Sequence, residues 1–311
     1  MTTDSLLACP VCGSDLIKYL DGFICSNKIC EHANTNALFN RIDKIPVLIS
    51  DTGCDTIFSP SHVDSLVVRS GDGGKLKALK KHIIGESKTT KSNISKFIKL
   101  LAIDNKTPNV LIIGAGEIGS GTDELFSAEL QIVGTDVYLS PNVDYVADAH
   151  YLPFKDNIFD GVLIQAVLEH VVDPQMVVSE IYRVLKKNGI VYAETPFMQQ
   201  VHEGAYDFTR YTVVGHRYLF KQFDKIDIGG LDGVGVALAW SIRAFIHAIS
   251  RSRLIAKLAF VPLKYVLTII EKFADPRSLY DANSGSYFLG KKSEKIISHK
   301  DIVKEYAGSD K

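Results

Sequence analysis

The sequence has almost no net charge and no long apolar run. Its 35 basic and 36 acidic residues give a formal net charge of -1, so nothing global favours a nucleic-acid partner. A membrane-spanning helix needs about 18 or more consecutive apolar residues, and no segment of the chain provides them. The first ten residues, "MTTDSLLACP", lack the basic start and apolar stretch of a secretory signal. We therefore expect a cytoplasmic protein.

Cysteine is also scarce, but it is clustered. Of five cysteines, Cys9, Cys12, Cys25 and Cys30 lie near the start of the chain. In the cytoplasm such a cluster favours metal binding over disulfides. The 311 residues are 46% hydrophobic, which is enough for one large packed domain with a small appendage.

The chain divides into several zones by composition. Residues 1–50 read as a miniature domain that ends in the apolar strand "KIPVLIS", and residues 51–107 as a polar linker with two leading helices, "KLKALKKHII" and "ISKFIKLLAI". Residues 108–295 form the predicted main domain, and 296–311 a C-terminal tail.

Strands and helices alternate in the main domain. "NVLIIG", "QIVGTDV", "VDYVAD", "FDGVLIQ" and "GIVYAETPF" read as strands, with helices over "GTDELFSAEL" and "DPQMVVSEIYRVLKK". Such alternation with short connections predicts an α/β fold in which helices cover both faces of a parallel sheet.

A helical insertion interrupts this rhythm before the last strand, "SGSYFLGKK". It covers about 232–283, as a cap over the sheet edge or the active site. Leu238, Ile242, Phe245 and Ile249 form one apolar stripe on its first helix. We expect this stripe to cover the sheet.

The segment "NVLIIGAGEIGSG" contains a G-x-G-x-x-G pattern at Gly114, Gly116 and Gly119. The pattern alone fits several nucleotide-like ligands, including a nicotinamide cofactor. Asp136 ends the second strand, where a carboxylate can accept hydrogen bonds from both ribose hydroxyls. Asp148 ends the third strand and can accept from an adenine amine, for which a nicotinamide enzyme has no special need.

With these residues in order, the chain resembles the class I S-adenosylmethionine-dependent methyltransferases of the type 11 group. The resemblance runs through "VLIIGAGEIGSGT", "VGTDVY", "DAHYLPFKDNIFDGVLIQAVLEHVVDP" and "EIYRVLKKNGIVYAETPF". It implies a Rossmann-like seven-stranded sheet and S-adenosylmethionine as the methyl donor. It also implies residues around the donor: Gly114 and Gly116 beside its methionine part, Asp136 at the ribose, Asp148 and Ala149 at the adenine, and Gln165 and Ala166 at the sulfonium.

One position departs from the family pattern. The family usually has an acid two residues before the first glycine, where it helps to orient the donor's ammonium group, and here that residue is Ile112. Glu117 could substitute for it. Glu169 and His170 in "LEHV" often occur in the family without acting as acid or base, so we expect His170 to be packed and hydrogen-bonded.

The loop after the fifth strand concentrates ionisable side chains in "VHEGAYDFTRY". In this fold the loop faces the methyl group of the donor. If the acceptor is a hydroxyl, His202 is the candidate general base, with Asp207 orienting it and Arg210 holding a substrate carboxylate or phosphate. In the alternative, Asp207 and Arg210 pair with each other and fix the loop.

The four clustered cysteines have the spacing C-x2-C followed by C-x4-C. Two such pairs can supply four thiolates to a tetrahedral structural Zn²⁺ ion and leave no open position for catalysis. The segment resembles zinc-ribbon proteins that accompany or precede methyltransferases. The alternatives are a degenerate ribbon, or His32 in place of Cys30.

These observations predict a methyltransferase that acts on a small molecule or a glycan precursor by O-methylation. The apolar, arginine-containing insertion leaves open a peripheral membrane contact and a lipid-linked acceptor. A non-catalytic donor-binding or partner-docking module is the alternative, and a nicotinamide-dependent oxidoreductase is a third reading.

Overall fold

The computed structural model describes residues 3–35, 37–60, 87–103, 105–117, 119 and 121–309. The first predicted leading helix, "KLKALKKHII", lies outside these residues. The second is α3 (Lys88–Leu101). Ser87 caps this helix, because its hydroxyl accepts a hydrogen bond from the backbone N–H of Thr90.

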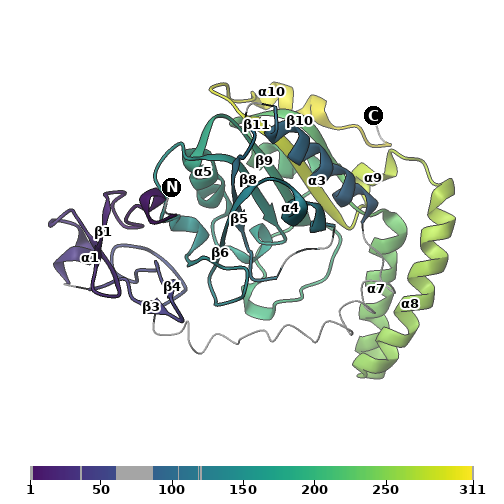
Figure 1. Ribbon diagram of the computed structural model, residues 1–311. Helices are drawn as coiled ribbons and strands as arrows, with labels where there is room; N and C mark the ends of the chain where they lie inside the picture. Colours follow the sequence, from purple (N-terminus) through teal and green to yellow (C-terminus); the bar gives the residue numbers. More distant parts are fainter. Residues whose placement is uncertain are drawn as a thin grey trace.

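A seven-stranded sheet forms the centre of the molecule, as Figure 1 shows. β11 is antiparallel to both of its neighbours, and the other paired strands run parallel. This sheet confirms the predicted Rossmann-like fold. In spatial order the strands are β10 (Phe223–Gly230), β11 (Gly285–Lys292), β9 (Leu185–Pro196), β8 (Phe159–Gln165), β5 (Asn109–Ile113), β6 (Gln131–Asp136) and β7 (Tyr145–Val146).

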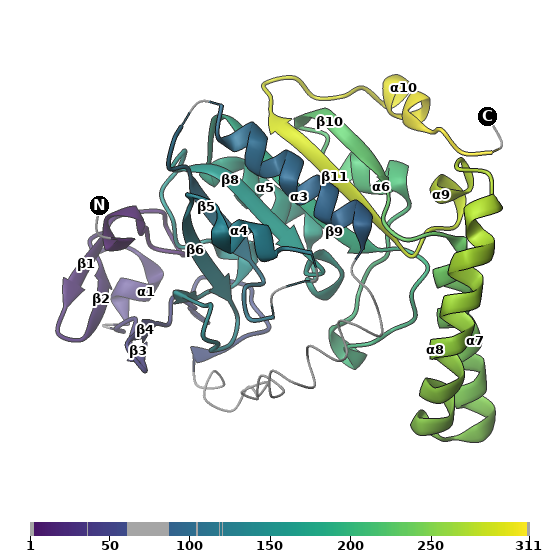
Figure 2. The ribbon, with the colours of Figure 1, turned by 45° about the vertical axis from the view of Figure 1, so that its right-hand side comes forward.

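Alternate residues of the central strands belong to two separate cores. On β5, Leu111 and Ile113 pack on the face that α5 (Pro174–Val184) and α6 (Val213–Leu219) cover. Val110 and Ile112 pack on the opposite face with α3 and α4 (Asp123–Ser127). The two-residue side-chain period of a strand produces this division, and the two helical layers are visible in Figure 2.

Two predicted helices are shorter than expected. α4 covers only Asp123–Ser127, because the chain turns extended at Ala128 to enter β6 at Gln131. α5 ends at Val184, since Leu185 already pairs with Phe159 of β8. The spacing of apolar residues in the sequence does not indicate where the backbone leaves a helix to pair with a neighbouring strand.

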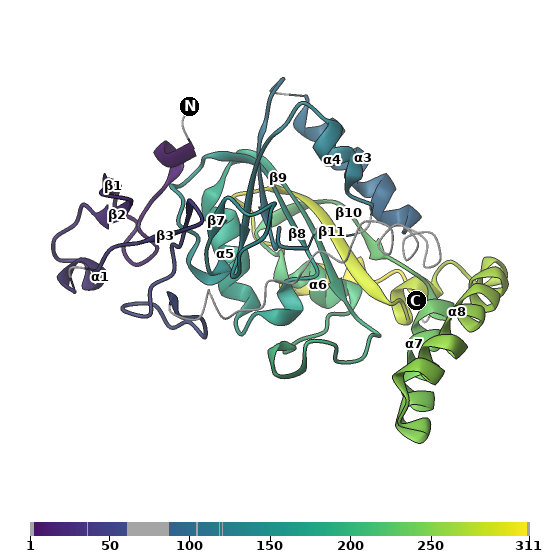
Figure 3. The same cartoon turned by 60° about the horizontal axis from the view of Figure 1, so that its bottom comes forward.

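The N-terminal segment packs against the β7 edge of the sheet (Figure 3). Val47 forms a parallel bridge with Val146, and the Leu48 N–H donates to the Val146 carbonyl at 2.8 Å. Leu7 and Phe39 belong to the same core as Leu111 of β5. The elements of this segment are η1 (Thr3–Leu6), β1 (Leu16–Tyr19), β2 (Gly22–Cys25), α1 (Glu31–Asn34), β3 (Arg41–Ile42) and β4 (Ile45–Pro46).

The insertion is a helical hairpin of α7 (Val234–Ser250) and α8 (Arg253–Ile270), which extends beyond the sheet in Figures 1 and 2. Phe245 and Ile249 are 65% and 68% exposed, so the expectation that this stripe covers the sheet is wrong. Small residues such as Ala237 and Ala239 are buried instead. The period of a helix fixes which residues share a face but not what covers that face.

Several short helices complete the description. They are η3 (Ala149–Tyr151), η4 (Leu168–His170), η5 (Gly204–Tyr206), η6 (Glu271–Phe273), α9 (Ser278–Asp281), α10 (His299–Ile302) and η7 (Val303–Glu305).

Candidate functional site

The glycine loop follows β5 at the point where the strand order reverses between β5 and β8. This is the position at which open α/β sheets bind ligands. Gly114 has φ +83°, and a Cβ there would lie 2.2 Å from Cγ2 of Val167. Both the backbone conformation and the close approach therefore require glycine.

Asp136, at the end of β6, holds this loop. One of its carboxylate oxygens accepts from the Gly116 N–H at 2.9 Å, and the other accepts from the Val137 N–H at 2.7 Å. The Ser140 hydroxyl donates to the Gly116 carbonyl at 2.9 Å. Asp136 can reach the loop because β6, which it ends, lies beside β5 in the sheet.

Asp148 lies just after β7 and is almost fully buried. It accepts hydrogen bonds from the His150 ring at 2.6 Å, from the His150 backbone at 2.9 Å, and from the Thr56 hydroxyl. Burial raises the pKa of Asp148, but these hydrogen bonds outweigh it and leave the pKa below its usual value. Its carboxylate is directed to protein partners, and its role at an adenine stays a prediction.

A hollow beside the glycine loop has a buried polar atom with no partner. Gln165 ends β8, and its side-chain oxygen has no hydrogen-bond partner among the described residues. A Cβ on Gly119 would lie 1.9 Å from that oxygen, so the oxygen lies directly against the loop. The hollow is lined by Ile112, Ile113, Gly114, Glu117, Gly119, Thr122, Leu125, Phe126, Leu163 and Gln165.

Glu194 is a buried acid that our sequence reasoning missed. It lies on β9 opposite Gln165, whose side-chain N–H donates to it at 2.6 Å. The hydroxyls of Thr90, at 2.7 Å, and Tyr192 also donate to Glu194. Burial raises the pKa of Glu194. An acid inside the apolar stretch "GIVYAETPF" was the available signal, because a buried charge needs such partners.

The acceptor-side residues come from two segments. Glu169 and His170 lie in η4 after β8, and His202 and Asp207 lie in the loop after β9. The Phe208 N–H donates to the Glu169 carbonyl at 2.7 Å and ties the segments together. The Nε2 atoms of His170 and His202 are 3.1 Å apart.

Arg210 is fully engaged within this loop. It forms a two-point pair with Asp207, and its Nε donates to the Gln199 carbonyl at 3.0 Å. Hydrogen bonds from Arg210 keep the pKa of Asp207 well below its usual value. Asp207 also accepts from the His202 N–H at 2.9 Å and lies 3.3 Å from Nδ1 of His202. The structure therefore contains the loop-fixing pair, and Asp207 can still orient His202.

Glu169 is the most unusual residue of this group. Its side chain is buried, and neither carboxylate oxygen has a hydrogen-bond partner among the residues the structure describes. Burial raises its pKa to about 7. The sequence did not indicate this burial of Glu169, because the exposure of a side chain in a short segment depends on its tertiary contacts.

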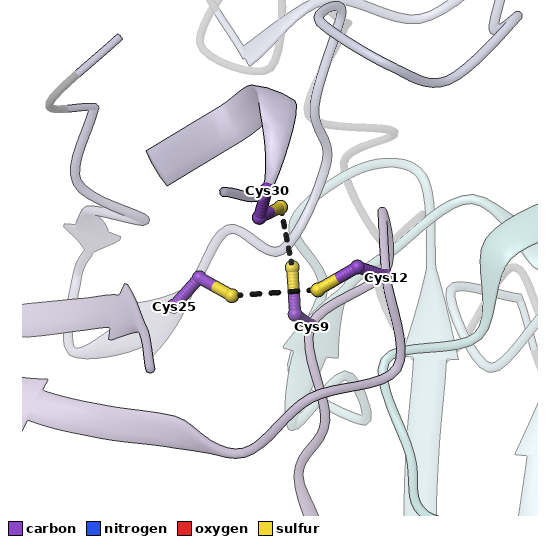
Figure 4. A group of neighbouring side chains, drawn as sticks. All are labelled: Cys9, Cys12, Cys25 and Cys30. Carbon is purple, nitrogen blue, oxygen red and sulfur yellow. Dashed lines mark hydrogen bonds between the residues drawn. The ribbon is translucent and has the colours of Figure 1, made fainter. Parts of the chain in front are cut away.

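The four N-terminal cysteines converge, as Figure 4 shows. The Sγ atoms of Cys9 and Cys30 are 3.9 Å apart, and those of Cys12 and Cys25 are 3.5 Å apart. Thiolates around a tetrahedral Zn²⁺, with Zn–S bonds of about 2.3 Å, are separated by about 3.8 Å. The residues thus fit a four-thiolate zinc site.

His32 does not join this cluster. Its ring stacks on Phe39 with centroids 3.9 Å apart, and its Nδ1 is 2.9 Å from the Ser50 hydroxyl. The alternative in which His32 replaces Cys30 is therefore not the arrangement seen.

Residues 111–193 match a family model described as a methyltransferase domain. The chain contains a class I S-adenosylmethionine-dependent methyltransferase domain. This match agrees with the predicted family and disfavours the nicotinamide-dependent reading. The domain includes the glycine loop, Asp136, Asp148 and Gln165.

Curated relatives match this domain over part of their length. The chain is 37% identical over 82 residues to "Ubiquinone/menaquinone biosynthesis C-methyltransferase UbiE" of Saccharophagus degradans, which covers 25% of the chain and 33% of that protein. It is 36% identical over 96 residues to "Demethylmenaquinone methyltransferase" of Renibacterium salmoninarum, covering 27% and 40%. The chain thus spans less than half the length of these two relatives.

Solved structures are similar to the chain at low identity. A putative sarcosine dimethylglycine methyltransferase from Galdieria sulphuraria has 16% identity and a TM-score of 0.43, with 67% of this chain and 86% of that chain covered. Phosphoethanolamine N-methyltransferase 2 of Haemonchus contortus, in complex with S-adenosyl-L-methionine, has 20% identity and a TM-score of 0.41, with 69% and 56% covered.

Proposed function

We propose that the protein transfers a methyl group from S-adenosylmethionine to a small-molecule acceptor. The observation that carries this proposal is the order of donor-side residues along one sheet edge. Gly114, Asp136, Asp148 and Gln165 follow or end β5, β6, β7 and β8, at the switch point of the sheet. The activated methyl group comes from the donor, and the protein supplies alignment.

The proposed contacts follow the geometry of this edge. Gly114 and Gly116 let the backbone approach the methionine part, and Asp136 accepts from the ribose hydroxyls. Asp148 and Ala149 border the adenine. Gln165 and Ala166 border the sulfonium, and Ala166 has φ +54°, which is an uncommon conformation for a residue other than glycine.

Gln165 and Glu194 offer a replacement for the acid that Ile112 lacks. The unpartnered oxygen of Gln165 can accept from the donor's ammonium group, and Glu194 holds the amide nitrogen of Gln165 at 2.6 Å. We infer that this pair, rather than Glu117, supplies the negative potential near the ammonium group. Ile112 is free to pack in the apolar core between α3 and the sheet.

Two acceptor chemistries remain as proposals. O-methylation follows from His202, which can remove a hydroxyl proton while Asp207 orients its ring. The second candidate is C-methylation of a quinone precursor, because the curated relatives carry the names of ubiquinone and menaquinone methyltransferases. Incubation of the protein with methyl-labelled donor and fractionated cell extract separates the two. The small molecule or glycan precursor that gains the label is isolated, and its new methyl group is identified as O–CH₃ or C–CH₃.

The hairpin supports a peripheral membrane role for this enzyme. None of the described helices is long and apolar enough to cross a membrane. Large apolar side chains on α7 and α8 are nevertheless exposed, and basic residues are interspersed among them. A helix with this character can lie in the membrane interface, where a lipid-linked acceptor would be available. The exposed residues are Leu238, Phe245, Ile249, Leu254, Ile255, Leu258, Val261, Tyr265, Val266, Ile269 and Ile270.

Calorimetric titration with S-adenosylmethionine tests the donor site. We expect saturable binding to the full chain, and binding about ten- to a hundredfold weaker for Asp136→Asn, because hydrogen bonds to a charged acceptor contribute about 1.5–3 kcal/mol. Asp224→Asn is the control, since Asp224 is exposed on β10 at the far side of the sheet. No binding at millimolar donor contradicts the enzyme proposal and favours the partner-docking module.

The four cysteines complete the proposed composition of the protein. We propose that Cys9, Cys12, Cys25 and Cys30 hold a structural Zn²⁺ ion, supported by their converging sulfur atoms. The ion would link β2, α1 and the turn that contains Cys9 and Cys12. Cys9, Cys25 and Cys30 belong to the same core as the methyltransferase sheet.

A further inference from the structure

Three potential ligand atoms converge beside the donor site, away from the cysteines. The Nε2 atoms of His170 and His202 lie 3.1 Å apart, and one Glu169 carboxylate oxygen lies 3.6 Å and 4.0 Å from them. The group joins η4 to the loop after β9. Glu169 comes four residues after Gln165, which borders the hollow.

The outer nitrogen of each ring determines what its Nε2 can do. Nδ1 of His170 is 2.7 Å from the Tyr206 carbonyl, which can only accept, so this nitrogen carries the proton. Nδ1 of His202 faces the Asp207 carboxylate at 3.3 Å, another acceptor. In the neutral tautomers that carry the proton on Nδ1, both Nε2 atoms present lone pairs to each other. A cation between them removes this repulsion.

Glu169 independently points to a cation. A carboxylate in a buried position needs a charged or hydrogen-bonding partner, and among the described residues neither of its oxygens has a hydrogen-bond donor. The nearby guanidinium of Arg210 is already occupied by Asp207 and backbone carbonyls. The Nε2 atoms of His170 and His202 lie 3.6 Å and 4.0 Å from one Glu169 oxygen, which is too far for a hydrogen bond.

We propose that Glu169, His170 and His202 bind a divalent first-row transition-metal ion. With metal–ligand bonds of about 2.1 Å, the spacings of 3.1, 3.6 and 4.0 Å correspond to angles of about 95°, 120° and 145° at the ion. Two imidazoles and one carboxylate are a common ligand set for such ions and leave coordination positions open.

The surrounding contacts support these three ligands. The Tyr206 carbonyl and the Asp207 carboxylate hold the outer nitrogens of the two imidazoles, as metal-binding histidines are usually held. Arg210 in turn fixes Asp207. The open positions of the ion could bind an acceptor oxygen beside the donor. That role rests on the proposed function, whereas ion binding itself does not.

Metal stoichiometry of the full chain tests the site directly. The protein is stripped of metal, reloaded with excess Zn²⁺, freed of unbound ion, and its zinc is measured by mass spectrometry. We expect two equivalents for the wild type, one at the cysteines and one at the new site. Glu169→Gln and His202→Gln should each retain one equivalent, and the control His247→Gln, at an exposed position on α7, should retain two.

Cys25→Ser assigns the two equivalents. It should lose the cysteine-bound ion and keep the one held by Glu169, His170 and His202. A wild-type chain with a single equivalent that Cys25→Ser loses overturns the proposal, as do two equivalents in both Glu169→Gln and His202→Gln. Circular dichroism verifies folding, and His202→Gln remains informative if the buried Glu169 variant unfolds, because His202 is partly exposed.

Donor titration separates this proposal from the proposed function. If the protein retains both equivalents but does not bind S-adenosylmethionine, the methyltransferase proposal fails and the metal site stands. If donor binding is intact and the second equivalent is absent, the metal site fails and the methyltransferase proposal stands.

Discussion

Ile112 has a packing role that an acid could not fill. It is buried with Phe97 of α3, Leu125 of α4 and Leu163 of β8. An ionised carboxylate at this point would lose its hydration without gaining donors. The buried acid lies instead at Glu194, where three side chains donate to it. The departure of Ile112 from the family pattern therefore accompanies a different placement of the buried acid.

Sequence patterns identified the glycine loop because its residues are close together in the chain. Gly114 and Gly116 could be found in this way, and Asp136 could be placed at a strand end. Glu194 could not, because its partner Thr90 is far away in sequence and comes from α3. The convergence of Glu169 with His202 was hidden for the same reason, since the two residues come from different connections of the sheet.

At the residue scale we predict that His202→Ala abolishes turnover and leaves donor binding unchanged. His202 reaches the acceptor side, whether as a base or as a metal ligand, and a base contributes about 10²–10⁴ in rate. The measurement is transfer of label from S-adenosylmethionine to the responsive extract fraction, with donor affinity from calorimetry. His247→Ala is the matched control. Turnover within about threefold of wild type in His202→Ala would contradict the prediction.

Among the elements, β8 was predicted to the residue, because a short and nearly continuous apolar run indicates a buried strand. α4 was predicted too long, because the pairing of Gln131 of β6 with Asn109 of β5 is a tertiary contact that local sequence does not indicate. The hairpin was predicted as two helices, but its exposure was not. Trp240 of α7 and Phe260 of α8 pack against each other, with ring centroids 5.0 Å apart, so the two helices bury apolar side chains between them rather than against the sheet.

The exposed face of the hairpin predicts membrane binding. We expect the full chain to sediment with vesicles that contain anionic lipid, because apolar side chains enter the interface and basic residues contact the headgroups. The double variant Phe245→Glu with Leu258→Glu should reduce the bound fraction at least about tenfold, because each change places a charge where an apolar side chain would enter the membrane interface. Sedimentation measures the bound fraction.

Ile103→Glu is the control for this experiment, because Ile103 is also exposed but follows α3 on the body of the molecule. Equal binding of the double variant and wild type would exclude the hairpin as a membrane contact. Size-exclusion chromatography of the same variants shows whether the apolar face instead joins two copies of the chain.

For the molecule as a whole, His216 links stability to pH. It is buried beside Thr195, and desolvation lowers its pKa to about 3. The unfolded value is about 6.5, so between these values the unfolded chain binds a proton that the folded chain does not. The free energy of unfolding contributed by this group is therefore greatest above pH 6.5 and falls as pH decreases, by up to about 1.4 kcal/mol per pH unit.

Urea unfolding at neutral and mildly acidic pH measures this dependence. His216→Gln should be less stable at neutral pH but should lose less stability on acidification, because glutamine does not titrate. His247→Gln retains the wild-type slope, since that side chain is exposed. The prediction fails if the slopes of wild type and His216→Gln coincide. Loss of the proposed Zn²⁺ ion on acidification would affect all three proteins alike and cancel in the comparison.

The bridge between Val47 and Val146 has a consequence for solubility. β7 is the last strand of its side of the sheet, and a strand in that position presents unpaired backbone groups that can recruit strands from other molecules. Leu48 occupies one of these groups by donating to Val146. The cysteine-containing segment thus covers part of a sheet edge that could otherwise self-associate, and the proposed Zn²⁺ ion, by holding its thiolates together, would contribute to keeping separate chains apart.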